Sequence, residues 1–379
     1  MMFLVTGLQG LFSHISMQNA KVKEKLSFKA AVLKELKKPL KLVNGIKALP
    51  LERGQILIKL AYSGVCHSQL MEIDGKRGRD DYLPHMLGHE GSGIVLKKHP
   101  SVKKLKEGDT VVLTWIKAKG IDAGGAKYIS NNDFINAGSV TTFNEYAVVS
   151  ENRCVKTPKG VPMDIAALFG CAVLTGSGIL KNTIKPKKNT SIAFFGLGGI
   201  GMSALALNKM YSFKNIFAID VNNQRLKEAE SFGANYLVNP LIDDPVEFIK
   251  NETDNEGVDY SIEAAGKTKT IEQAFESVKT KGGLSVFASH PEYGSSIKID
   301  PFQLISGKRI LGSWGGGASP DKDIPFYADL YLQGKLDLKK LITKRYKLED
   351  INLAIRDLKK GKVLRPIIEI DKSIKNTSI

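Results

Sequence analysis

Residues 191–201 read SIAFFGLGGIG, and this stretch decides the fold: an apolar run meets a cluster of glycines at Gly196. The apolar run predicts a buried strand, and the segment after the glycines predicts a helix. In a G-x-G-x-x-G pattern between a strand and a helix, Gly196 makes the tight turn, Gly198 lets backbone amides approach a pyrophosphate, and Gly201 allows close helix packing. The helix start also offers free N–H groups to phosphates. The stretch therefore predicts a dinucleotide-binding fold.

An acidic residue follows the next apolar run. Asp220 comes directly after residues 215–219 and lies 19 positions beyond Gly201. A carboxylate there can accept hydrogen bonds from the hydroxyls of an adenosine ribose, and it would repel a 2′-phosphate. The position therefore favours NAD over NADP, with Arg225 near the ribose or adenine side. The alternative reading of Asp220 is an aspartate in a surface turn.

Strands and helices alternate around this motif. An apolar run at 258–262 precedes a helical stretch at 270–279, whose apolar residues recur at i, i+3, i+4 and i+7. Residues 284–288 form the next expected strand. This alternation predicts an α/β fold, a doubly wound parallel sheet with helices on both faces.

The two ends of the chain show a different sequence pattern. Near the C-terminus, residues 351–358 repeat the helical spacing, Gly361 supplies a stop, and 366–370 form a last strand. Residues 27–149 predict a compact all-β lobe, because β-rich stretches alternate with Gly, Asp, Asn and Pro turns. These stretches are FKAAVL (28–33), GQILIKLAYSGV (54–65), GSGIVLKK (91–98), DTVVLTW (109–115) and EYAVV (145–149).

Composition bounds the possible functions. The chain has 379 residues, 42% of them hydrophobic, which is enough for two cores. Its formal net charge of +16 would permit binding to nucleic acid. The lysines are spread out and not interleaved with aromatic residues, so a solvated basic surface is favoured over a nucleic-acid groove.

The three cysteines cannot form an even-numbered disulfide framework, which favours a reducing cytoplasm. The opening MMFLVTGLQGLFSHISM lacks a basic start and is short for a bilayer span, so no membrane attachment is expected. It is interpreted as an extension before Met17. A cryptic targeting segment is the alternative.

A metal site is suggested by three separated residues. Cys66 follows a strand, His89 follows a loop, and Cys171 lies before the helix that leads into the glycine motif. Taken singly, a buried cysteine is most often a small apolar side chain, and a lone histidine most often belongs to the core. Together, two thiolates and one imidazole leave a fourth tetrahedral position open, as a catalytic zinc requires.

These motifs, in this order, resemble the medium-chain zinc alcohol dehydrogenase family over residues 25–372. The matching text is GVCHS (64–68), LPHMLGHEGSGIV (83–95), GDTVVL (108–113), GCAVLTG (170–176), GLGGIG (196–201), GVDYSIEAAG (257–266) and LRPIIEI (364–370). The resemblance implies a GroES-like catalytic domain made from residues 25–172 and 322–379, with a Rossmann domain, 173–321, inserted between them. Residues 1–24 would be an N-terminal extension.

The resemblance also implies a role for each site residue. The three candidate ligands resemble those of one catalytic zinc, Glu90 resembles the carboxylate beside the metal, and Ser68 the hydroxyl that takes the substrate alcohol's proton. A hydride would pass between NAD and an alcohol or carbonyl carbon whose oxygen is on the zinc. The other positions resemble cofactor and pocket residues: His67 and Arg365 near the phosphates, Thr175 and Ile200 by the nicotinamide, Gly199 in the glycine loop, and Trp115 in the substrate pocket.

The chain departs from the family in two places. Relatives with a structural zinc carry four closely spaced cysteines, whereas residues 117–137 contain none, so no structural zinc is expected. Many relatives have an aspartate directly after the serine and a proton-relaying histidine two residues later. Here those positions hold Gln69 and Met71. We therefore expect the relay to end at Ser68 and the cofactor ribose, or to run through water.

Two other functions remain open at this stage. A zinc-free quinone or enoyl reductase would share both domains but lack the ligand trio, and a non-catalytic nucleotide-binding protein would have lost a ligand or Gly198. Residues 308–317 resemble the segment by which relatives pair two nucleotide domains, so a homodimer is expected, with a tetramer open. The sequence does not identify the alcohol or the direction of the reaction.

Overall fold

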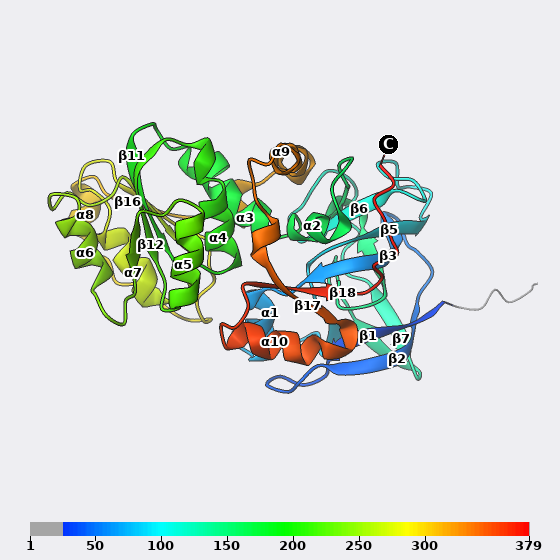
Figure 1. Cartoon of the computed structure of the whole chain (residues 1–379). Coiled ribbons are helices and arrows are strands. Elements are labelled where there is room, and N and C mark those ends of the chain that lie inside the picture. Colours follow the sequence, from blue (N-terminus) through cyan, green and yellow to red (C-terminus); the bar gives the residue numbers. More distant parts are fainter. Residues whose placement is uncertain (1–25, 379) are drawn as a thin grey trace, which may run out of the picture.

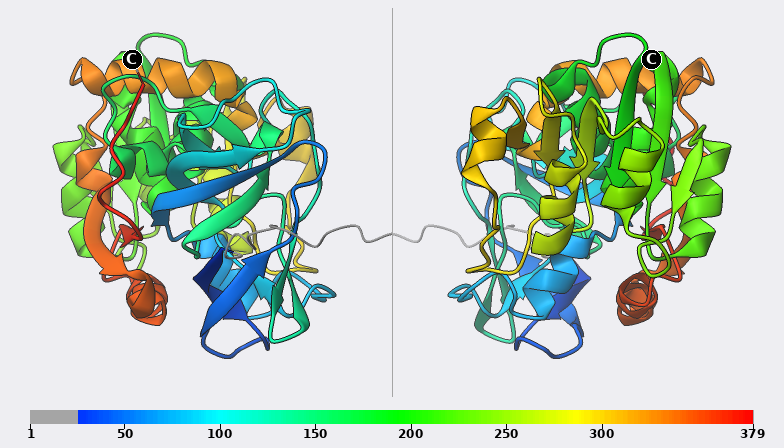
Figure 2. Two further views of the ribbon diagram at one scale, coloured as in Figure 1. Left: turned by 90° about the vertical axis from the view of Figure 1, so that its right-hand side faces the viewer. Right: turned by 90° about the vertical axis from the view of Figure 1, so that its left-hand side faces the viewer.

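The computed structural model describes residues 26–378, and its two halves lie side by side (Figures 1 and 2). One half is built on a six-stranded parallel sheet in the order β13-β12-β11-β14-β15-β16. Its strands are β11 (Thr190–Phe195), β12 (Phe213–Ile219), β13 (Tyr236–Val238), β14 (Tyr260–Glu263), β15 (Leu284–Phe287) and β16 (Arg309–Gly312). The helices that alternate with them are α4 (Gly199–Ala206), α5 (Asn223–Ser231), α6 (Pro245–Asn251), α7 (Thr268–Glu276) and α8 (Pro301–Ile305).

Both faces of this sheet are covered. Along β11, Ile192 and Phe194 join a core that includes residues of α4 and α5. The alternate residues, Ala193 and Phe195, join a second core with residues of α6 and α7. Because successive side chains of a strand point to opposite faces, the continuous apolar run places one core on each side. The predicted doubly wound sheet is confirmed.

The other half combines residues from both ends of the chain (Figure 1). A closed barrel has the order β1-β2-β7-β8-β4, and beside it lies a sheet in the order β10-β6-β5-β3-β18-β17, with β9 also paired to β3. Late strand β18 runs antiparallel to early strand β3, with Ile367 opposite Gly64. The strands are β1 (Ser27–Leu33), β2 (Lys41–Ala48), β3 (Gln55–Gly64), β4 (His85–Met86), β5 (Glu90–Lys98), β6 (Thr110–Thr114), β7 (Lys127–Ser130), β8 (Asp133–Asn136), β9 (Tyr146–Ser150), β10 (Cys154–Lys156), β17 (Ile342–Lys347) and β18 (Arg365–Glu369).

The prediction that residues 27–149 are all β was wrong at one place, because helix α1 (His67–Ile73) lies there. The helix begins with a capping box: the side chain of Cys66 accepts the backbone N–H of Gln69, and the side chain of Gln69 accepts the backbone N–H of Cys66. Leu70 and Ile73 of this helix are buried. At seven residues the helix is too short for a clear periodic signal. The remaining helices are α2 (Met163–Leu168), α3 (Ala172–Gly178) with a π-helical continuation at Ile179–Ile184, α9 (Pro320–Leu332) and α10 (Ile351–Lys359).

The second half of the cysteine-free segment 117–137 is part of the barrel. Strands β7 and β8 pair as a hairpin, and β7 also pairs with β2. Tyr128 of β7 is fully buried, and its hydroxyl accepts a hydrogen bond from the backbone N–H of Val148 at 2.7 Å. Barrel packing therefore holds this segment in place. Among residues 26–378, no helix is long and apolar enough to cross a bilayer, and the opening segment 1–24 lies outside the described residues.

Candidate active site

A cleft of about 2010 Å³ is lined by residues of both halves. The parallel sheet contributes residues at the carboxyl ends of β11, β12, β14 and β15, which is the edge where open α/β sheets bind ligands. The other half contributes the start of α1 and the segment before β5. The volume exceeds that of an ordinary small-molecule pocket, roughly 300–1,000 Å³, so it has room for a dinucleotide and a substrate together.

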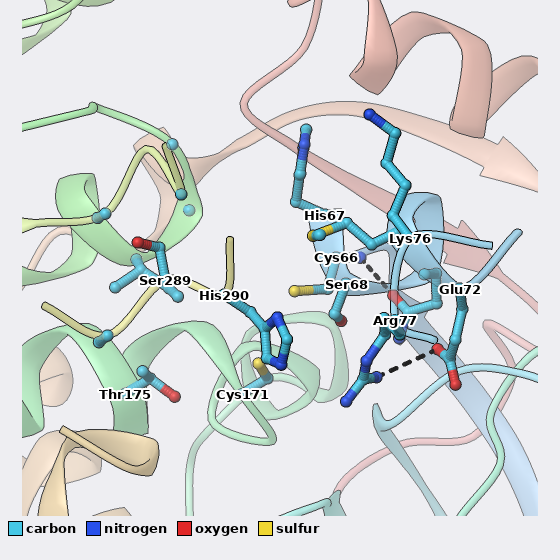
Figure 3. A pocket seen from close by; sticks show the side chains of 18 of the residues that line it. Cys66, His67, Ser68, Glu72, Lys76, Arg77, Cys171, Thr175, Ser289 and His290 are labelled. Atoms are coloured by element: carbon cyan, nitrogen blue, oxygen red, sulfur yellow. Dashed lines mark hydrogen bonds and ion pairs between the residues drawn. The ribbon is translucent and has the colours of Figure 1, made fainter. Parts of the chain in front are cut away.

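Three ligand-type side chains converge at one point of this cleft. The candidate ligand atoms of Cys66, His89 and Cys171 all lie within 4.8 Å of one another. Both cysteines are buried, and the histidine Nε2 is buried without a hydrogen-bond partner among the described residues. Figure 3 shows the sulfur atoms of Cys66 and Cys171 facing the same space.

The two sulfurs are joined by a hydrogen bond that shifts their pKa values in opposite directions. A hydrogen bond from the Cys171 thiol lowers the pKa of Cys66 well below its usual value, and the same bond, with burial, raises the pKa of Cys171. Burial alone would have raised the pKa of both cysteines. A cation bound at this point would displace the remaining proton, because thiolates are the form that ligates metals.

A buried ion pair stands next to the three residues. The Glu90 carboxylate pairs with the Arg365 guanidinium, and the two side chains are almost completely buried. Glu90 also accepts a hydrogen bond from the backbone N–H of Ala172 at 3.2 Å. Burial raises the pKa of Glu90, against the opposing charge of Arg365. Burial alone would lower the pKa of Arg365, but the nearby Glu90 and the two cysteines raise it by more, so the pKa of Arg365 is raised.

The glycine loop has the shape that the sequence predicts. Gly196 has φ +87°, a conformation that favours glycine, and a Cβ on Gly201 would lie 2.0 Å from the carbonyl oxygen of Gly196. A Cβ on Gly198 would meet open space, and one on Gly199 would lie 3.0 Å from Nη1 of Arg365. Helix α4 begins at Gly199, so its first N–H groups face the cleft beside Arg365.

Asp220 lies beyond β12 in the same cleft and is 7% exposed. Its Oδ2 accepts the backbone N–H of Leu197 at 2.7 Å, and its Oδ1 accepts that of Asn222 at 2.9 Å. Arg225 stands 3.8 Å from the carboxylate. The acid is therefore tied to the glycine loop itself, which holds it at the nucleotide side of the cleft.

The other predicted positions also line the cleft: His67, Ser68, Trp115, Thr175 and Ile200. The hydroxyls of Ser68 and Thr175 are buried and have no hydrogen-bond partner among the described residues. Trp115 packs edge-on against the His89 ring with centroids 6.3 Å apart. Unpaired buried hydroxyls in a cleft are available to a bound molecule.

The cleft residues that sequence reasoning missed include Arg153, Ser289, His290 and Trp314. Figure 3 shows Ser289 and His290 among the side chains that line the cleft. These two follow β15, so the rule that ligands bind beyond the carboxyl ends of parallel strands could have found them. Arg153 and Trp314 carry no comparable signal.

Gln69 bridges two of the candidate ligands. Its Oε1 accepts the backbone N–H of Cys66 at 2.7 Å, which places its amide nitrogen 2.6 Å from Nδ1 of His89. An amide NH₂ group only donates, so Nδ1 is the acceptor and the ring proton sits on Nε2. A metal on Nε2 needs the proton on Nδ1 instead, and the Gln69 amide can accept that proton only if its oxygen turns from the Cys66 N–H toward His89.

We therefore expect Gln69→Glu to bind zinc more tightly, because a carboxylate accepts from both N–H groups without turning. The expected gain is about tenfold or more, the range typical of groups that orient metal ligands. Competition with a chelator at fixed pH measures it, with Gln69→Met as the comparison that removes both polar groups. Equal or weaker zinc binding by a folded Gln69→Glu protein would contradict this interpretation.

The residues present fit a zinc ion, since two sulfurs and an imidazole nitrogen form a soft donor set that leaves one position open. Joined to a dinucleotide-type sheet, this site defines a metal-dependent dehydrogenase. A family model described as "Alcohol dehydrogenase GroES-like domain" matches residues 52–159, and one described as "Zinc-binding dehydrogenase" matches 199–331. The chain belongs to the zinc-dependent medium-chain alcohol dehydrogenase family.

Individual relatives agree with the family models. The chain is 30% identical to "Alcohol dehydrogenase class-3" of Dictyostelium discoideum, over 91% of this chain and 98% of the relative. It is 30% identical to an S-(hydroxymethyl)glutathione dehydrogenase of Synechocystis, over 90% and 99%. The crystal structure of benzyl alcohol dehydrogenase from Acinetobacter calcoaceticus superposes with a TM-score of 0.82, at 31% identity over 91% and 99%.

These findings confirm the predicted fold class and family. The protein is a zinc-dependent alcohol dehydrogenase that uses a nicotinamide cofactor, and neither the metal-free reductase nor the non-catalytic protein is favoured.

Proposed function

We propose that this chain oxidises a primary or secondary alcohol, or reduces the matching aldehyde or ketone, with NAD as its cofactor and one zinc held by Cys66, His89 and Cys171. The observation that carries the proposal is the convergence of these ligand atoms within 4.8 Å, in the cleft that also holds the glycine loop. A zinc ion supplies Lewis-acid chemistry there, polarising the substrate oxygen.

The chain's own residues position the reactants. The buried Ser68 hydroxyl has no partner among the described residues and takes the proton of the substrate alcohol. Glu90 stands beside the metal ligands, held by Arg365, and Thr175 and Ile200 hold the nicotinamide. Burial of these groups excludes water from the reacting atoms, so the dipoles around them act at low dielectric.

The nucleotide is held along the glycine loop. Gly196, Gly198, Gly199 and Gly201 cradle the pyrophosphate, and the side chains of His67 and Arg365 lie near it. Asp220 accepts hydrogen bonds from the ribose hydroxyls, with Arg225 beside them. A carboxylate that is 7% exposed and tied to the loop backbone has no room to move away from a 2′-phosphate, which supports NAD over NADP.

We expect the protein to turn over benzyl alcohol with NAD at least about a hundredfold faster, in kcat/KM, than with NADP. Asp220→Asn keeps the shape and removes the negative charge, so it should lower that ratio at least tenfold, roughly 1.4 kcal/mol of discrimination. The control is Asp243→Asn, which removes the same charge at an exposed position elsewhere in the half that holds the parallel sheet. Equal rates with both cofactors in the parent protein would contradict the assignment of Asp220.

The domain limits follow from the same assignment. Residues 25–172 and 322–379 form the catalytic domain and 173–321 the nucleotide domain, after an N-terminal extension of residues 1–24. The pairing of β18 with β3 supports this division, because it joins the two separated parts of the catalytic domain.

The protein acts as a homodimer in the cytoplasm. Strand β16 is the edge of the parallel sheet, and apolar side chains near it are exposed: Leu311 by 48%, Phe302 by 69% and Ile305 by 81%. An exposed apolar sheet edge is a surface on which a second copy can continue the sheet. None of the three cysteines forms a disulfide, which supports a reducing compartment.

A further inference from the structure

One wall of the cleft is aromatic and leads away from the metal ligands. The Trp115 ring lies between His89, at 6.3 Å, and Trp314, at 5.1 Å, with the two tryptophan planes at 88°. Trp314 is 76% exposed, which is unusual for so large an apolar side chain. The indole nitrogen of Trp115 is buried and has no partner among residues 26–378. The wall therefore offers flat apolar surface and an unused hydrogen-bond donor.

A cation stands beside this wall. Arg153 ends a short 3-10 turn, Glu151–Arg153, and its Nη1 donates to the carbonyl oxygen of Trp115. No other hydrogen bond ties the guanidinium to the part of the chain that the structure describes, and its Nε is buried without a partner. Burial lowers the pKa of Arg153, and the more distant Asp122, which already pairs with Lys117 at 2.8 Å, only partly offsets this.

The other arginines of the cleft differ from Arg153, because each has a carboxylate within 4.0 Å. Those pairs are Arg77 with Glu72, Arg79 with Asp81, Arg225 with Asp220 and Arg365 with Glu90. Among residues 26–378 no carboxylate comes that close to Arg153. A half-buried guanidinium without a counter-ion is a ready partner for an anion, and a planar carboxylate fits its fork of donors best.

We propose that Trp115, Trp314 and Arg153 select the substrate: an alcohol or aldehyde with a flat aromatic body and a carboxylate at the end remote from the reacting oxygen. The aromatic body packs on the two indoles while its oxygen faces the metal ligands. The carboxylate pairs with Arg153. This assignment rests on the proposed function, since it names the substrate of the same site.

The test compares two alcohols that differ only in the remote group, benzyl alcohol and 4-(hydroxymethyl)benzoate. With NAD, the parent protein should prefer the carboxylate at least about tenfold in kcat/KM, the size of one charge-assisted hydrogen-bonded pair. Arg153→Met should lower that preference at least tenfold. Arg79→Met, which removes an exposed and already paired cation from the same cleft, should leave the preference unchanged. No preference in the parent protein, or equal losses for both alcohols in Arg153→Met, would overturn the proposal.

A second readout does not depend on turnover. Trp115 and Trp314 are the only two tryptophans in the chain, so indole fluorescence reports this wall alone. Titration of zinc-loaded protein with 4-(hydroxymethyl)benzoate should quench the emission with an affinity that falls at least tenfold in Arg153→Met and not in Arg79→Met. Quenching with no turnover of either alcohol would reject the proposed function and keep the binding site. Equal affinities in the three proteins would reject the site itself.

Discussion

Replacing Cys66 with alanine should remove the zinc and the activity while leaving the nucleotide site intact. The ligand atoms of the trio lie within 4.8 Å of one another, so two remaining donors cannot complete a tetrahedral site. We expect zinc per chain to fall close to zero, and kcat for alcohol oxidation to fall at least about a thousandfold. NADH binding, followed by its fluorescence, should be unchanged, because the glycine loop belongs to the parallel sheet.

Cys154→Ala is the matched control for this experiment. Cys154 is equally buried, lies in β10 and belongs to a core cluster away from the trio. Its removal should cost about 1 kcal/mol of stability, the loss expected for a small buried group, and leave zinc content unchanged. Zinc retained in Cys66→Ala, or lost equally in Cys154→Ala, would show that the metal is bound elsewhere.

The second large effect is expected for Arg365→Met, which leaves the Glu90 carboxylate buried without its cation. Breaking a buried pair in this way typically costs about 3–5 kcal/mol. Arg345→Met is the control, because Arg345 forms a half-exposed pair with Asp164 at 2.8 Å, and such pairs are worth under about 1 kcal/mol. Chemical denaturation of both variants at pH 7 measures the difference.

The loss in Arg365→Met should also depend on pH. Burial already raises the pKa of Glu90, and removing Arg365 takes away the charge that opposes this. The folded variant then keeps a proton that the unfolded chain has released, so its stability falls as the pH rises above about 4.5, near the ordinary pKa of glutamate. The penalty should be smaller at pH 5 than at pH 8. A penalty that is equal at both, or that matches Arg345→Met, would show that Glu90 does not depend on Arg365.

Much of the fold could be predicted from sequence, because its signals are local. The apolar run and glycines at 191–201 specify a strand, a turn and a helix within eleven residues, and the structure places β11 and α4 there. Helix α1 was missed because seven residues make less than two helical turns, too few for the apolar spacing of a helix to repeat. Its capping box also depends on a Cys side chain, a residue that rarely caps a helix.

The candidate site was only partly accessible to the same reasoning. Cys66, His89 and Cys171 are chemically distinctive residue types, so their convergence could be anticipated from the family's motif order. Trp115 was also expected in the substrate pocket. The contacts of Gln69 with two of the ligands, and the placement of Arg153 and Trp314 beside Trp115, could not be anticipated. These residues come from separate segments, and only tertiary packing brings them together.

The most direct test of the account is the amount of zinc in the parent protein. Protein purified from metal-controlled medium and measured by elemental analysis should contain one zinc per chain, since the described residues offer one three-ligand cluster. Two zincs per chain would require a second site that the account does not contain. A folded, NADH-binding protein with no zinc, even after incubation with excess zinc, would contradict the central claim that Cys66, His89 and Cys171 hold a catalytic metal.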